Sequence, residues 1–127
     1  MATILVVEDE RDVITLIRFV LEKAGLGVIE AHNGREALQK LGLEPGEPAA
    51  RPDAIVLDIM MPVLDGLGVN AQLQQNDATR GIPVVVLTAK GTMRDLIQQA
   101  PNVAAYIEKP FDPEQLKQVV LGLLKAK

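Results

Sequence analysis

Five short apolar runs, separated by stretches with helical periodicity, constrain the fold of this chain more than any other feature. The runs are rich in valine and isoleucine, and three of them are apolar throughout. Strands that are covered on both faces of a parallel sheet have this composition. The runs lie at 3–7, 27–31, 54–57, 84–87 and 103–107.

Helices are expected between these strands and after the last one. Apolar residues at helical spacing fill 13–24, and Gly25 supplies a stop. Asn33 and Glu36 form a capping-box pattern before a second helix. Strands alternating with helices predict a doubly wound α/β domain with helices on both faces of the sheet. The other helices are expected around Leu67 and Ala71, over 93–100 with Pro101 as the stop, and from Asp112 to Leu123.

The composition narrows the class of protein. A chain of 127 residues suits one domain, and it contains no cysteine for disulfides or thiolate chemistry. It has no apolar run long enough to span a membrane and no signal-peptide pattern, so we expect a cytoplasmic protein without a membrane partner. A net charge of −4 and only three aromatic residues argue against direct nucleic-acid binding.

Polar side chains follow four of the predicted strands. In an open α/β sheet, ligands bind beyond the carboxyl ends of the strands, so these side chains should share one rim. Crowded carboxylates call for a cation, and Mg²⁺ suits carboxylates, water and phosphate oxygens. A hydroxyl and an ammonium group nearby suit a phosphoryl group, with a carboxylate as the possible nucleophile. The residues are Glu8, Asp9, Asp58, Thr88 and Lys109, whereas Glu10 is expected to be a helix cap or solvated turn residue.

Four segments resemble the receiver domain of two-component response regulators, in that family's order and over essentially the whole chain. They are "ILVVEDE", "DAIVLDIMMPVLDG", "PVVVLTA" and "YIEKPF". The resemblance implies a single receiver domain over 1–127. It also implies a flavodoxin-like sheet of five parallel strands in the order 2-1-3-4-5, with five helices.

The resemblance also implies roles for the acidic residues. Asp58 is expected to accept a phosphoryl group from a sensor histidine kinase or a phosphotransfer protein. Asp9 and Asp58 are expected to ligate Mg²⁺ together with the backbone carbonyl of Met60, and Glu8 to assist through water. The domain is not expected to be an enzyme beyond self-phosphorylation from phosphodonors and slow autodephosphorylation.

The remaining implied roles concern the switch. Thr88 and Lys109 are expected to contact the phosphoryl group, and the small Ala89 leaves room for the donor. Tyr106 is the expected aromatic switch residue, and the Lys109–Pro110 bond is a candidate for the cis form. The output face is expected to comprise the fourth helix, the fifth strand and the fifth helix, where such domains bind partners or form homodimers. Its residues here include Arg94, Asp95, Gln98, Gln99 and Glu108.

Other functions stay open at this point. A receiver-like domain that signals without phosphorylation is the main alternative. A Mg²⁺-dependent hydrolase would normally carry a second acid where Met60 stands. A flavin-binding protein would carry a Ser/Thr-rich phosphate loop after the first strand, where this chain has acids that would repel the flavin phosphate. The sequence departs from the family at Pro101 and Asn102, so the fourth helix is expected to be short, shifted or mobile, and its coupling to Tyr106 is open. Whether the domain acts alone or within a longer regulator is also open.

Overall fold

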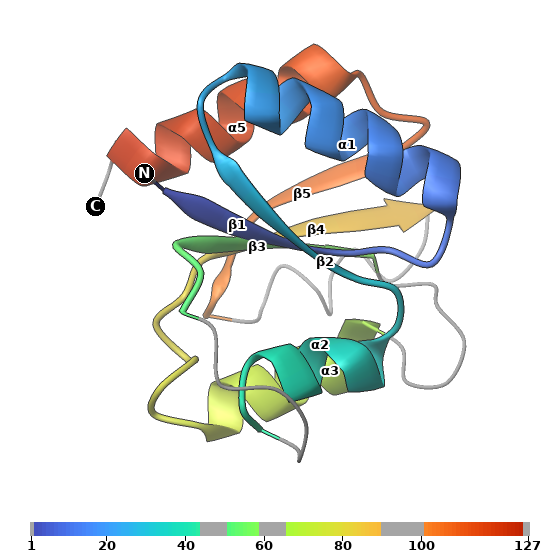
Figure 1. The fold of residues 1–127 in the computed structure, drawn as a ribbon. Helices are drawn as coiled ribbons and strands as arrows, with labels where there is room; N and C mark the ends of the chain where they lie inside the picture. The colour runs from blue at the N-terminus through green and yellow to red at the C-terminus, as the bar shows by residue number, and fades with distance from the viewer. Residues whose placement is uncertain (1, 44–50, 59–65, 90–100, 126–127) are drawn as a thin grey trace.

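A computed structural model describes residues 2–43, 51–58, 66–89 and 101–125 of the chain (Figure 1). All five predicted strands are present and form one parallel sheet in the order β2-β1-β3-β4-β5. The predicted doubly wound sheet is therefore confirmed. The strands are β1 (Thr3–Val7), β2 (Gly27–Ala31), β3 (Ala54–Asp58), β4 (Val84–Ala89) and β5 (Val103–Lys109).

Three strands continue one or two residues beyond the predicted apolar runs. β3 ends at Asp58, β4 at Ala89 and β5 at Lys109, where the runs end at 57, 87 and 107. The ladder continues because its hydrogen bonds join backbone groups, which polar residues also possess. Asp58, Thr88 and Lys109 therefore belong to the strands themselves, and the rigid sheet sets the direction of their side chains.

Helices cover both faces of the sheet within the described residues. Figure 1 shows α1 and α5 on one face and α2 and α3 on the other. The helix predicted over 93–100 lies outside the residues that the structure describes. No helix in the described part of the chain is both long enough and apolar enough to cross a membrane. The bounds are α1 (Arg11–Lys23), α2 (Gly34–Lys40), α3 (Gly66–Gln75) and α5 (Pro113–Lys125).

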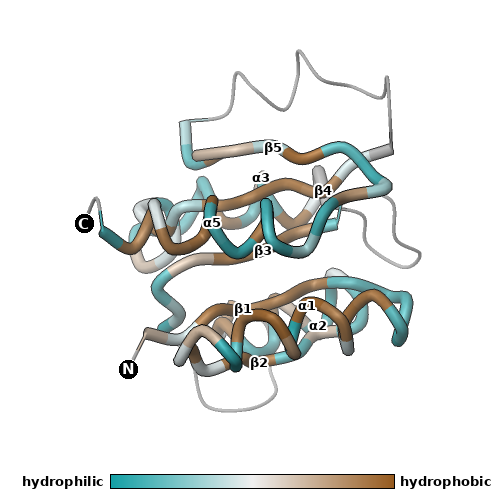
Figure 2. Tube along the Cα trace, turned by 90° about the horizontal axis from the view of Figure 1, so that it is seen from above, coloured by the Kyte–Doolittle hydropathy of each residue, from teal (hydrophilic) through white to brown (hydrophobic). Residues whose placement is uncertain are grey.

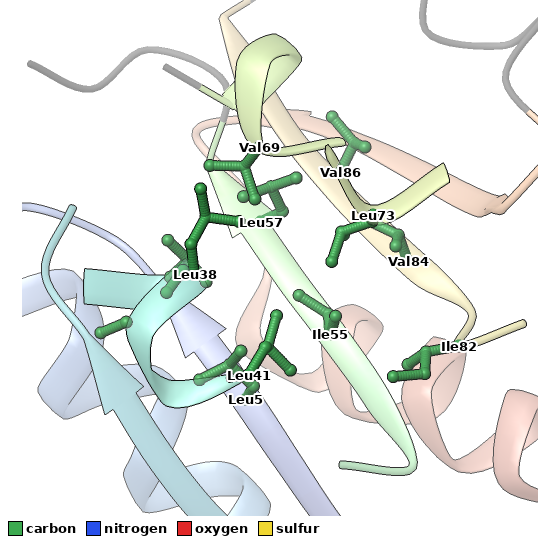
Figure 3. Packing of buried hydrophobic residues seen from close by; sticks show 13 residues of the cluster. Leu5, Leu38, Leu41, Ile55, Leu57, Val69, Leu73, Ile82, Val84 and Val86 are labelled. Atoms are coloured by element: carbon green, nitrogen blue, oxygen red, sulfur yellow. The ribbon is translucent and has the colours of Figure 1, made fainter. Parts of the chain in front are cut away.

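Each face of the sheet carries its own hydrophobic core. Side chains alternate between the two faces along a strand, so neighbours such as Val56 and Leu57 enter different cores. Hydrophobic residues accordingly run along most of β1 in the hydropathy view (Figure 2). In Figure 3, Leu38 of α2, Leu41 at the C-cap of that helix, and Val69 and Leu73 of α3 pack against the strands. The strand residues labelled in Figure 3 are Leu5, Ile55, Leu57, Val84 and Val86.

The capping prediction for α2 is confirmed for one of its two hydrogen bonds. The Asn33 side chain accepts a hydrogen bond from the Glu36 backbone N–H at 2.8 Å. In the second bond of a capping box, the Glu36 carboxylate would accept from the backbone N–H of Asn33. Here that carboxylate contacts His32 instead, with 3.1 Å between its Oε1 and the imidazole Nδ1. His32 is exposed.

The helix expected around Leu67 and Ala71 is present as α3, but Ala71 does not face the core. Ala71 is exposed, whereas Val69, Asn70 and Leu73 are buried. Val69 and Leu73 are four residues apart and therefore share the side of the helix that packs on the sheet. The sequence signal was weak because a buried asparagine interrupts the apolar stripe of this helix.

Asn102, noted above as a departure from the family, links α3 to the start of β5. Its Nδ2 donates to Asn70 Oδ1 at 2.6 Å, and its Oδ1 accepts from Gln74 Nε2 at 2.9 Å. Its backbone carbonyl accepts from the Val84 N–H at 2.9 Å. Asn102 is 7 % exposed and Asn70 8 %, so these amides satisfy one another away from water. We refer to Asn70, Gln74 and Asn102 as the amide clamp.

Candidate functional site

The carboxyl edge of the sheet gathers most of the predicted site residues. Glu8 follows β1, Asp58 ends β3 and Lys109 ends β5. In the strand register, Asp58 pairs with Leu87, and Lys109 pairs with Ala89. Glu8, Asp58 and Lys109 therefore come from three strands that are distant in sequence and meet at one rim. The predicted contribution of the Met60 carbonyl lies outside the described residues.

Lys109 joins two buried carboxylates. Its Nζ lies 3.1 Å from Glu8 Oε2 and 3.3 Å from Asp58 Oδ2. Glu8 is fully buried, and Asp58 is 1 % exposed. One ammonium group thus stands between two acids, so the three groups carry a net negative charge when both acids are ionised. A further cation or a proton would neutralise the excess.

The electrostatics of Glu8 reflect this crowding. Burial of the carboxylate and the negative charge of Asp58 raise the pKa of Glu8 to about 7, although Lys109 and the Glu10 N–H favour the ionised form. Burial tends to lower the pKa of Lys109, but the charges of Asp58 and Glu8 outweigh it and raise that pKa above its ordinary value. Lys109 therefore stays protonated, and Glu8 takes up a proton more readily than an ordinary glutamate does.

Three consecutive acids offer oxygen ligands for a cation. The side chains of Glu8, Asp9 and Glu10 each present a carboxylate oxygen, and these oxygens lie within 4.8 Å of one another. Glu8 is buried, whereas Asp9 and Glu10 are exposed. Carboxylate oxygens that open to water on one side suit a hard divalent ion such as Mg²⁺, which keeps part of its hydration shell.

Glu10 extends this cluster beyond the sequence prediction. It occupies the N-cap position of α1, as expected, but its side chain makes no capping hydrogen bond. Instead, its carboxylate lies among the ligand candidates, and its backbone N–H donates to Glu8 Oε1 at 3.2 Å. The run of three acids in "EDE" was the available signal, but the cap interpretation assigned the third acid elsewhere.

The other predicted residues lie along β4 and β5. Thr88 is fully buried in β4, and Ala89 ends that strand. Tyr106 is half-buried in β5, and it packs against the core beneath α2 and α3. The Lys109–Pro110 peptide bond is cis.

A Glu8→Gln variant is expected to stabilise the metal-free protein at alkaline pH. The native pKa of Glu8, near 7 against an ordinary 4.5, means that folding favours the protonated form. This contribution to stability is complete below the ordinary pKa and is lost as the pH rises through 7. The neutral amide should therefore raise the free energy of unfolding by up to about 3 kcal/mol at roughly pH 8, with little change at about pH 5.

Urea unfolding in the presence of a chelator measures this difference. Glu22→Gln is the matched control, because Glu22 is an exposed acid of α1, and its substitution should change stability by no more than about 0.5 kcal/mol. A Glu8→Gln protein that is less stable than the parent at alkaline pH would contradict the assigned burial cost.

Comparison with known proteins assigns the chain to a family. The sequence model described as "Response regulator receiver domain" matches residues 4–121. The alkaline phosphatase synthesis transcriptional regulatory protein PhoP of Bacillus subtilis is 40% identical over 123 residues, which are 96% of this chain and 48% of PhoP. The phosphate regulon transcriptional regulatory protein PhoB of Escherichia coli is 40% identical over 114 residues, which are 89% of this chain and 47% of PhoB. The chain thus spans about half the length of these curated relatives.

Solved structures agree with this assignment. The chemotaxis response regulator CheY4 of Vibrio cholerae superposes with a TM-score of 0.85 at 27% identity, covering 97% of this chain and 98% of CheY4. The receiver domain of a sensor histidine kinase from Pseudomonas aeruginosa superposes with a TM-score of 0.82 at 28% identity, covering 98% of each chain. The latter is described with a magnesium ion coordinated in its active site cleft.

Proposed function

Because the chain belongs to the response regulator receiver domain family, we propose that it is a phosphoacceptor switch in which Asp58 takes up a phosphoryl group. The observation that carries this proposal is the position of Asp58, buried at the rim of the sheet with Lys109 Nζ 3.3 Å from its carboxylate. The proposed domain comprises residues 1–127.

The proposed reaction is transfer from a phosphohistidine. An oxygen of the Asp58 carboxylate attacks phosphorus, the phosphorus–nitrogen bond of the donor breaks, and the imidazole departs with a proton from solvent. Lys109 offsets the negative charge on the phosphoryl oxygens. We assign Mg²⁺ to Asp58, Asp9 and Glu8, with Met60 contributing its carbonyl. Bound there, the ion supplies positive charge to the oxygens of the transferring group.

The proposed response follows from charge. Phosphorylation replaces the single charge of the Asp58 carboxylate with a phosphoryl group that carries close to two negative charges and offers three acceptor oxygens. The Thr88 hydroxyl and the Lys109 ammonium are the groups proposed to contact these oxygens, with the small Ala89 beside them. Tyr106 would repack as Thr88 moves, which shifts the population between two existing conformations. Thr88 and Tyr106 lie on adjacent strands, which supports this coupling.

Intact-mass analysis after incubation with acetyl phosphate tests the proposal. We expect a Mg²⁺-dependent gain of one phosphoryl group in the parent protein and none in Asp58→Asn. Asp77→Asn should behave like the parent, because Asp77 is an exposed acid in the turn after α3. If the parent fails to gain mass from acetyl phosphate and from a phosphorylated histidine kinase, the domain acts instead as an interaction module without phosphorylation.

A partner surface is proposed on α1, close to the site. Leu16 and Phe19 are 43% and 61% exposed, and they are the large hydrophobic side chains exposed in the described part of the chain. Phe19 borders a hollow between α1 and α5, which Lys23 and Lys117 also line. α1 begins at Arg11, directly after the three acids of the site, so exposed apolar side chains on this helix suit contact with a protein that brings a phosphohistidine to Asp58.

Phe19→Ala is expected to slow phosphorylation by a histidine kinase by about tenfold, the loss typical of an exposed aromatic anchor at an interface. Phosphorylation by acetyl phosphate should not change, because this small donor needs no protein contact. Glu22→Ala, on the same helix, is the matched control and should leave both rates unchanged. Equal slowing with both donors would instead indicate that Phe19 affects the site itself.

The output of the switch is proposed to pass through the face formed by β5 and α5, together with the fourth helix predicted from the sequence. The curated relatives are named as transcriptional regulators, and this chain matches about half of their length. We therefore propose a cytoplasmic domain that controls a partner or an attached output domain, without itself binding nucleic acid or membrane. Homodimerisation through the same face is part of this proposal.

A further inference from the structure

Tyr106 forms a hydrogen bond with another residue of its own strand. Its hydroxyl donates to Glu108 Oε1 at 3.2 Å. The two residues are two positions apart on β5, so their side chains extend from the same face of the sheet. Both side chains are half-buried, and the Tyr106 ring packs on the hydrophobic core beneath α2 and α3. The carboxylate of Glu108 therefore limits where the phenol group can lie.

The strand register places Glu108 beside Thr88, the other residue of the proposed switch. In the parallel ladder, Glu108 is the partner of Thr88, and Tyr106 is the partner of Val86. Neighbouring strands lie about 4.8 Å apart, and partners in register have side chains on the same face. Glu108 thus forms a hydrogen bond with Tyr106 and lies opposite Thr88 on the neighbouring strand. Tyr106 and Thr88 are the two residues that move together in the proposed switch.

We propose that Glu108 is a positioning residue that holds Tyr106 in the unphosphorylated arrangement and so opposes the switch. This inference rests on the proposed function, because it concerns the response to a phosphoryl group at Asp58. Glu108 has no part in the phosphoryl chemistry itself. It lies outside the groups expected to contact the phosphoryl oxygens, and it acts only through Tyr106 and Thr88.

Two physical effects make the carboxylate oppose the phosphorylated state. A hydrogen bond to an ionised acceptor is stronger than one between neutral groups, so movement of the phenol costs more than loss of an ordinary contact. The Glu108 charge also lies one strand away from Thr88, whose hydroxyl is to approach the negative phosphoryl oxygens. Glu108 and the phosphoryl group both carry negative charge, so their repulsion disfavours the phosphorylated protein as well.

The contact can be measured without phosphorylation, because Tyr106 is the single tyrosine and the chain has no tryptophan. Tyrosine emission therefore reports on one side chain. A carboxylate that accepts a hydrogen bond from an excited phenol quenches its emission, so Glu108→Ala and Glu108→Gln should both increase the emission of the folded protein. Asp77→Asn is the control and should leave the emission unchanged. Unchanged emission in both Glu108 variants overturns the proposed contact.

The restraint is measured with beryllium fluoride, which imitates a phosphoryl group on a carboxylate. Glu108→Ala should lower the half-saturating concentration in calorimetry by about three- to tenfold, as expected on loss of one charged hydrogen bond. Tyr106→Phe removes the hydroxyl and keeps the charge, and it should also lower this concentration. Glu108→Gln is nearly isosteric and keeps a hydrogen-bond acceptor, so it should lower the half-saturating concentration less than Glu108→Ala does. It replaces Glu108→Ala as the test variant if the alanine variant does not fold.

The outcomes separate this inference from the proposed function. If beryllium fluoride binds the parent and Glu108→Ala equally well, or binds the variant more weakly, the restraint is wrong although the phosphoacceptor site is intact. If the half-saturating concentration of beryllium fluoride falls in the Glu108 variants but not in Tyr106→Phe, the effect comes from charge alone, and this result also overturns the hydrogen-bond restraint. If no protein, the parent included, binds beryllium fluoride or accepts a phosphoryl group, the proposed function fails and the restraint fails with it.

Discussion

Replacement of Lys109 by methionine is expected to lower the free energy of unfolding of the metal-free protein by about 3 kcal/mol at roughly pH 8, because it leaves two buried carboxylates without their shared cation. Lys109 Nζ lies 3.1 Å from Glu8 and 3.3 Å from Asp58, and both acids are almost completely buried. Methionine keeps much of the apolar stem of lysine, so the loss reports mainly on charge.

The pH dependence identifies the cause of this loss. Glu8 already has a pKa near 7 with Lys109 present, and removal of the ammonium group should raise it further. Below that pH, Glu8 binds a proton in the folded state and the repulsion between the acids falls, so the destabilisation should shrink at about pH 5.5. Millimolar Mg²⁺ should also restore stability, because a divalent cation replaces the missing charge.

Urea unfolding at both pH values, with chelator or with Mg²⁺, tests this expectation. Lys117→Met is the matched control, because Lys117 pairs with the exposed Glu114 of the same helix at 2.8 Å. A pair of this kind, between a partly exposed lysine and an exposed glutamate, contributes about 0.5 kcal/mol, and its loss should vary little with pH in this range. A Lys109→Met protein with the same stability deficit at both pH values would show that packing, rather than charge, explains the loss.

Asn102→Ala is expected to destabilise the fold by about 3 kcal/mol through loss of the amide clamp. The substitution removes two side-chain hydrogen bonds and leaves the buried Asn70 Oδ1 without the donor that it has at 2.6 Å. A buried polar group that loses its partner costs about 1–3 kcal/mol, in addition to the bonds themselves. Chemical denaturation of the single variant, monitored by circular dichroism, measures the change.

A double-variant cycle distinguishes the clamp from general packing. Asn70→Ala combined with Asn102→Ala removes both partners, so the double variant should lose less stability than the sum of the two single losses. Asn76→Ala is the control, because Asn76 donates to the Gln72 carbonyl on the surface and should matter little. Strict additivity of the two substitutions would mean that the buried amides do not stabilise one another.

Much of the fold follows from local patterns in the chain. Five apolar runs each became a strand, and the alternation with helices required a parallel sheet with both faces covered. The helix signals that depend on immediate neighbours, such as Asn33 before Glu36 and the glycine stop at Gly25, also hold. Patterns of this kind are local because the backbone hydrogen bonds and side-chain spacing that they describe lie within a few residues.

The amide clamp and the inner face of α3 did not follow from local patterns. In the sequence, Asn102 stands out only as a departure from the family pattern, and its partners Asn70 and Gln74 are 32 and 28 positions away. Only the packing of α3 on the sheet brings these amides together and removes water from them. The same holds for Glu10, whose carboxylate joins Glu8 and Asp9 instead of capping its helix.

The sequence by itself determined the sheet, its doubly wound connections and the set of polar residues at its carboxyl edge, because strand ends are local features and parallel strands end together. The tertiary structure alone decided how these residues interact. Lys109 lies between Glu8 and Asp58. The Tyr106 hydroxyl donates a hydrogen bond to Glu108, which is the strand partner of Thr88. Such contacts depend on strand register, rotamer and burial, which are fixed only when distant segments of the chain pack against one another.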